Sequence, residues 1–107
     1  MSILKNLEPA RVWKHFEALC AIPRPSKHES AAAKYVTDQC TSWGLAVEQD
    51  RAGNVVARKT PSGNRQRGST VILQSHLDMV PQKNEETTHD FLRDPIVPWI
   101  DGEWVRA

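Results

Sequence analysis

The most informative stretch of the sequence is Val71-Ile-Leu-Gln-Ser-His-Leu-Asp-Met-Val80, because it joins an apolar run to a pair of polar side chains. Its first three residues form a short, continuous apolar run, which is typical of a strand buried on both faces of a sheet. His76 and Asp78 come just past the carboxyl end of this run, where open α/β sheets place their functional sites. The stretch therefore predicts an inner strand with a site at its end.

His76 and Asp78 are two positions apart, so in an extended chain both project to one side while Leu77 points back toward the core. An imidazole beside a carboxylate is typical of a metal site, in which one ring nitrogen binds the ion and the carboxylate fixes the ring. A surface histidine hydrogen-bonded to an aspartate is the alternative interpretation of the same spacing. A catalytic zinc needs three protein ligands, so this pair can form only part of such a site.

A first helix is predicted upstream, from about Pro9 to Cys20. Val12, Phe16 and Leu19 recur there at helical spacing and form one apolar stripe. The prolines that follow, Pro23 and Pro25, end this helix and force an extended stretch.

A second helix is predicted from the Ser26–Glu29 capping-box pattern to about Trp43. Gly44 is placed to terminate it in the left-handed conformation. Beyond Gly44 the apolar period changes to two, which predicts a strand pair formed by residues 45–50 and 55–59. A polar loop at 61–68, an irregular stretch at 81–98 and a final hairpin at 99–105 are expected to follow.

Length and charge limit the classes of function. The chain has 107 residues, enough for one modest domain, and its formal net charge of +1 argues against general nucleic-acid binding. No stretch has the length of a membrane span or the apolar core of a signal peptide, and two cysteines without a metal-binding spacing indicate reduced thiols. We therefore expect a soluble, cytoplasmic protein without a membrane partner. The basic stretch 51–70 is interpreted as solvated loops in preference to an anion site.

Several motifs of the sequence resemble those of a known family. The run Ser75-His-Leu-Asp-Met-Val80 with Pro81-Gln-Lys83 closely resembles the first metal-binding motif of the M20-type metallopeptidases. Further short segments resemble the bacterial aminoacyl-histidine (Xaa-His) dipeptidases, which are carnosinase-like enzymes. These segments are Cys20–Glu29, Trp43-Gly44, Gly53-Asn54-Val55, Asp94-Pro95-Ile96 and Gly102–Ala107. The resemblance covers essentially the whole chain.

The resemblance implies an α/β fold: residues 1–107 would be the N-terminal part of a zinc-peptidase-like catalytic domain, with two helices, a strand pair and an inner strand. It implies that His76 is a metal ligand and that Asp78 orients it. The complete enzyme would use two divalent ions, usually zinc, to activate a water, with a glutamate as general base. Its substrate would be a dipeptide with a C-terminal histidine, and it would be a homodimer.

The remaining family ligands and the general base match no residue here, so we expect the chain to need the rest of the catalytic domain and to be inactive alone. His15, His28 and His89 match no family ligand either. Two alternatives stay open: a non-catalytic truncated remnant or binding module, and another M20 amidohydrolase such as a tripeptidase or aminoacylase. The segments Ile22–Lys27 and Met79–Lys83 favour a dipeptidase over another M20 amidohydrolase.

Overall fold

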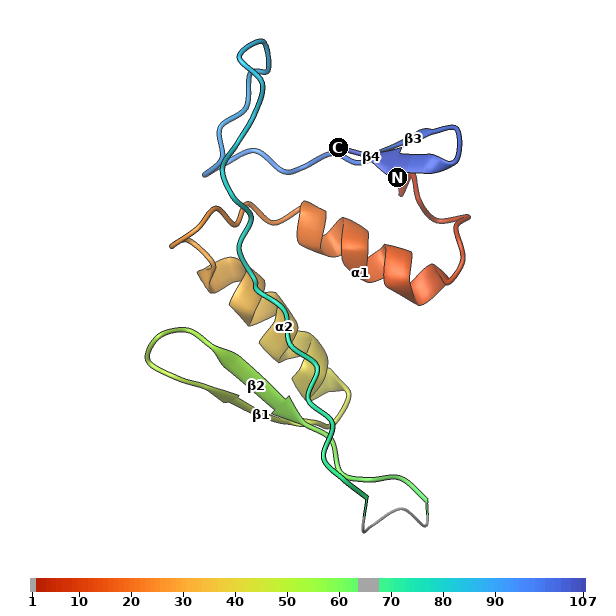
Figure 1. Ribbon diagram of the computed structural model, residues 1–107, viewed down its shortest axis with the longest axis vertical. Coiled ribbons are helices and arrows are strands. Elements are labelled where there is room, and N and C mark those ends of the chain that lie inside the picture. The colour runs from red at the N-terminus through yellow and green to blue at the C-terminus, as the bar shows by residue number, and fades with distance from the viewer. Residues whose placement is uncertain (1, 64–67) are drawn as a thin grey trace.

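The computed structural model describes residues 2–63 and 68–107, and it contains two helices and two antiparallel strand pairs (Figure 1). The helices are α1 (Ala10–Cys20) and α2 (Ser30–Ser42). The strands are β1 (Ala46–Gln49), β2 (Val55–Arg58), β3 (Trp99–Asp101) and β4 (Trp104–Arg106). This arrangement confirms the predicted α/β fragment and both predicted hairpins. Residues 64–67 of the loop expected at 61–68 lie outside the described residues.

Helix α2 and the β1–β2 hairpin form one packing unit, in which both strands contact the helix. Gly44 has a φ of 76° and ends α2 as predicted. The Leu45 amide donates to the Cys40 carbonyl at 3.1 Å and the Gly44 amide to the Thr41 carbonyl at 2.9 Å, which is the Schellman pattern. The strands pair with Val47 opposite Ala57. The helix end therefore turns the chain directly into the hairpin that covers it.

The predicted capping box at the start of α2 is wrong. The helix begins at Ser30, its N-cap is Glu29, and no side chain caps it. Lys27 has a φ of 73°, a left-handed conformation that a helix cannot include, and the His28 amide closes a turn onto the Pro25 carbonyl at 2.9 Å. The turn delays the helix by three residues and frees the Ser26 hydroxyl for another partner.

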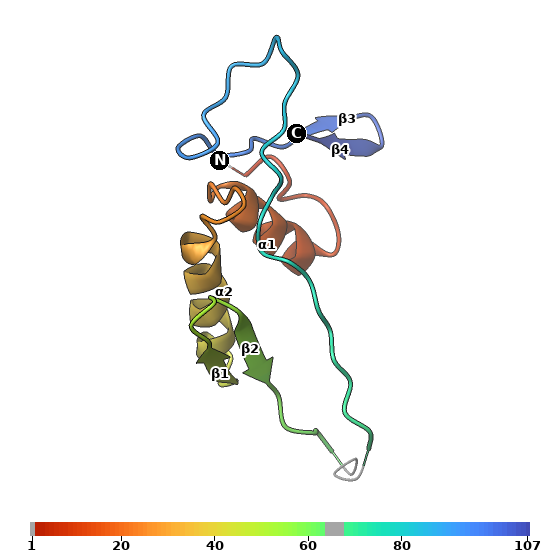
Figure 2. The ribbon, with the colours of Figure 1, turned by 60° about the vertical axis from the view of Figure 1, so that its left-hand side comes forward.

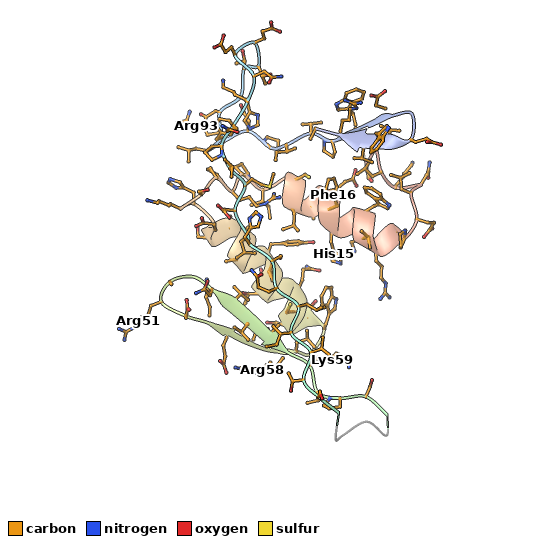
Figure 3. The ribbon with its side chains drawn as sticks, viewed as in Figure 1. His15, Phe16, Arg51, Arg58, Lys59 and Arg93 are labelled. Atoms are coloured by element: carbon orange, nitrogen blue, oxygen red, sulfur yellow. The ribbon has the colours of Figure 1, made fainter. Side chains whose placement is uncertain are left out.

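The β3–β4 hairpin lies beside α1 (Figure 1). Phe16 of the helix and Ile100 and Trp104 of the hairpin line an apolar groove between these elements. Figure 3 shows Phe16 on the side of α1 that faces the hairpin, whereas His15 is on the side that faces α2. Helix α1 therefore has apolar or aromatic neighbours on two sides.

The predicted inner strand at Val71–Leu73 does not form. These three residues have no strand partner in the part of the chain that is described, and they are 80%, 84% and 93% exposed. Figure 2 shows the segment as an extended trace set apart from α2 and its hairpin. A strand buried on both faces needs neighbouring strands. In the described residues, the segment that follows this run makes one isolated parallel bridge, between Met79 and Pro25.

The chain as a whole is open. Its radius of gyration is 16.6 Å, where a compact domain of this length has about 13 Å. Its accessible surface is 9419 Å², where about 6,000 Å² is typical for this mass. Within the described residues, Leu4, Cys20, Ala32 and Ala33 form the small buried core, and Pro25 and Pro98 are also buried.

Candidate metal-binding site

His76 and Asp78 lie together at the end of the extended segment, as the two-residue spacing predicts. His76 Nδ1 is 2.9 Å from Asp78 Oδ1. The side chain of His76 is 72% exposed and that of Asp78 is 28% exposed, while Leu77 between them is half-buried. An ionised carboxylate can only accept, so in the neutral form of the imidazole this contact puts the proton on Nδ1 and leaves the Nε2 lone pair free.

Asp78 has a second partner that the sequence analysis missed. Ser26 Oγ donates to Asp78 Oδ2 at 2.6 Å, so each carboxylate oxygen accepts one hydrogen bond. The hydrogen bond from Ser26, followed by that from His76, lowers the pKa of the Asp78 carboxyl below its ordinary value of 3.8. Asp78 is therefore an acceptor for both side chains at neutral pH. Because Ser26 and Asp78 are far apart in the sequence, no local pattern could have indicated this contact.

The loop between α1 and α2 holds the backbone next to Asp78. The amide of Met79, the residue after Asp78, donates to the Arg24 carbonyl at 2.9 Å. Arg24 is itself anchored, because its guanidinium donates to the Leu19 carbonyl near the end of α1. The loop 21–29 and the segment 76–79 are thus joined both through backbone and through side chains.

The three remaining histidines occupy other places. His15 Nδ1 lies 2.7 Å from the Tyr35 hydroxyl, and its ring meets the Trp43 ring edge-on at a centroid distance of 5.4 Å. His89 packs edge-on against Phe91 at 5.0 Å, and His28 is exposed in the loop before α2. These contacts support a packing role for His15 and His89.

Among the described residues, neither cysteine completes a group of potential metal ligands with His76 and Asp78. Cys20 and Cys40 are free, and burial raises the pKa of the Cys20 thiol. Of the basic residues predicted to be solvated, Arg51 extends from the turn between β1 and β2 (Figure 3), and Arg58 pairs across the hairpin with Glu48 at 2.9 Å. Arg65 and Arg67 lie outside the described residues.

Across residues 2–63 and 68–107, no three His, Cys, Asp or Glu side chains are grouped so that they could together hold a metal ion. Within these ranges, the His76–Asp78 pair is therefore not accompanied by a third potential metal ligand. In the same described ranges, no helix combines the length and apolar character needed to cross a membrane.

Two known proteins resemble this chain along nearly its whole length. A cytosol non-specific dipeptidase of Escherichia coli (strain K12) is 48% identical over all 107 residues, which cover 22% of that protein. The crystal structure of an aminoacylhistidine dipeptidase from Vibrio alginolyticus matches 95% of the chain with a TM-score of 0.88 and 49% identity, over 21% of its own length. No protein-family model matches.

These similarities confirm the resemblance to the aminoacyl-histidine dipeptidases that the motifs indicated. The chain corresponds to the N-terminal part of such a protein and spans about a fifth of the length of the relatives it matches. At a TM-score of 0.88 the arrangement of helices and hairpins is also that of the matched part of the Vibrio alginolyticus structure.

Proposed function

We propose that this chain forms part of the catalytic domain of a metal-dependent dipeptidase, to which it contributes His76 as a metal ligand. The observation that carries the proposal is the 2.9 Å contact between His76 Nδ1 and Asp78 Oδ1 on a largely exposed imidazole. The similarity to two dipeptidases gives this pair a chemical context.

The donor set fits a divalent cation such as zinc. A neutral imidazole with one nitrogen held by a carboxylate and the other free is the usual form of a histidine ligand. Asp78 keeps the ring proton on Nδ1 and balances part of the cation's charge, while His76 Nε2 is the atom that would bind. The chemistry that such ions would supply, when bound, is polarisation of the scissile carbonyl and a lowered pKa of a bound water.

The proposed substrates are dipeptides, including carnosine-like dipeptides with a C-terminal histidine, and the proposed location is the cytoplasm. The relatives' names support these assignments, since one is a cytosolic non-specific dipeptidase and the other an aminoacylhistidine dipeptidase. The other ligands and the general base would come from the rest of the catalytic domain, in a homodimeric enzyme.

A chimera tests this function. The 107 residues replace the aligned segment of the Escherichia coli dipeptidase, and hydrolysis of Xaa-His and other dipeptides is measured with and without added zinc. We expect metal-dependent hydrolysis by the chimera and none by the 107-residue chain alone.

In the chimera, His76→Ala should reduce kcat/KM at least about 100-fold, because it removes a metal ligand. His28→Ala, an exposed histidine of the loop before α2, is the matched control and should change it little. Equal activity of the His76→Ala and His28→Ala chimeras would contradict the proposed function.

A further inference from the structure

We propose that Ser26 is a positioning residue that holds Asp78, and through it His76, in the geometry that presents Nε2 to a cation. The inference rests on the proposed function of His76 as a ligand and extends it to a residue in a different part of the chain. The Ser26 hydroxyl donates to the carboxylate, through Oγ to Oδ2 at 2.6 Å, so Ser26 acts through Asp78 and not on the metal.

A single hydrogen bond would leave the Asp78 carboxylate free to rotate. The imidazole that Asp78 holds is 72% exposed, so surrounding packing restricts the ring little, whereas the Asp78 side chain is only 28% exposed. The bond from Ser26 to Oδ2 and the contact of His76 with Oδ1 together fix both oxygens. The orientation of the imidazole therefore depends on a serine beyond the carboxylate.

Ser26 is itself held at this place by backbone contacts on either side. Pro25 before it accepts the His28 amide at 2.9 Å, and Lys27 after it has a φ of 73°. The left-handed region is unfavourable for a lysine, so this turn persists because neighbouring contacts impose it. The Met79-to-Arg24 hydrogen bond, also 2.9 Å, keeps the partner segment in register with the turn.

The test reads the proton position on His76 directly. The full 107-residue chain is labelled with 15N at histidine, and the ring nitrogens of His76 are assigned at about pH 8, where an ordinary imidazole is neutral. The wild-type ring should be mainly the Nδ1–H tautomer, as donation to Asp78 requires. Ser26→Ala should shift the tautomer populations toward those of a free histidine side chain, and Ser26→Thr, which keeps the hydroxyl, should restore them. Ser30→Ala is the control on an exposed serine nearby and should have no effect.

Zinc titration followed at the same resonances gives the second readout. Loss of the support of a ligand by an outer residue costs about 10–100-fold in metal affinity, so Ser26→Ala should weaken zinc binding at His76 at least about 10-fold. A wild-type ring without the Nδ1–H preference, or a Ser26→Ala chain that matches wild type in tautomer and zinc affinity, would overturn the positioning role.

The two proposals fail in different ways. If zinc reaches His28 and His89 before His76 in the wild-type chain, the metal-ligand function of His76 is contradicted, and the role of Ser26 in presenting that ligand falls with it. If zinc prefers His76 and Ser26→Ala changes neither readout, the function stands and only the role of Ser26 is overturned.

Discussion

Ser26 and Asp78 are 52 positions apart in the sequence, yet Ser26 Oγ donates to Asp78 Oδ2 at 2.6 Å. This contact joins the loop between the two helices to the segment that carries His76. It links the local pattern that the sequence reveals, a histidine two positions before an aspartate, to a tertiary arrangement that only the fold provides.

Removing the Asp78 carboxylate should reduce catalysis more than replacing it with an amide. In the chimera with the Escherichia coli dipeptidase, Asp78→Ala should lower kcat/KM about 100-fold, because His76 loses the acceptor that sets its tautomer. Asp78→Asn keeps an oxygen that can accept from Nδ1, so a smaller loss is expected. Steady-state hydrolysis of a dipeptide compares the two variants, and equal losses would argue against an orienting role for the carboxylate.

The sequence predicts local features of this chain well. Both helices, the Gly44 terminator and the two hairpins follow from patterns within a few residues, and all are present. The inner strand at Val71–Leu73 was wrong for this chain, because a strand forms by pairing with neighbours and its apolar composition alone cannot supply them. The capping box was wrong for a related reason: Ser26 bonds to Asp78 instead of to the start of its own helix.

The exposed run Val71–Leu73 should make the isolated chain associate. Three consecutive apolar residues at least 80% exposed, with no strand partner in the part of the chain that the structure describes, are a template for intermolecular strand pairing. We expect Ile72→Lys to reduce association, measured by light scattering at increasing protein concentration. Ile3→Lys, which alters a 52% exposed residue outside the run, is the control and should leave association unchanged. A wild-type chain that stays monomeric would refute this prediction.

Leu4 should stabilise α1 despite its position near the start of the chain. Its side chain is fully buried, and Glu17 of α1 accepts hydrogen bonds from the backbone amides of Ile3 and Leu4 at 3.0 and 3.1 Å. Leu4→Ala leaves a cavity and should cost about 2–3 kcal/mol. Hydrogen exchange of the α1 amides measures the change. Leu92→Ala, at a 60% exposed leucine, should stay within about 0.5 kcal/mol of wild type, and a similar effect of both variants would contradict the packing role of Leu4.

The turn between β1 and β2 should weaken in acid. Asp50 Oδ1 accepts from the Ala52 and Asn54 amides at 2.9 Å, and Oδ2 accepts from the Asn54 side chain at 2.8 Å. The bonds from Asn54, side chain first, hold the pKa of Asp50 below its ordinary 3.8. A carboxyl with a lowered folded-state pKa stabilises the fold above its ordinary pKa, and this stabilisation is lost as the pH falls through the lowered value.

We therefore expect the Ala52 and Asn54 amide resonances to move with a midpoint below pH 3.8. In Asp50→Asn this titration should disappear. A midpoint at or above the ordinary value in the wild-type chain would show that these hydrogen bonds do not form in solution.

The most direct test of the central claim is the metal content of the chimera after dialysis against metal-free buffer, measured by elemental analysis. We expect the wild-type chimera to retain zinc, His76→Ala to retain less per chain, and His28→Ala to retain as much as wild type. Undiminished zinc in the His76→Ala chimera would contradict the assignment of His76 as a metal ligand.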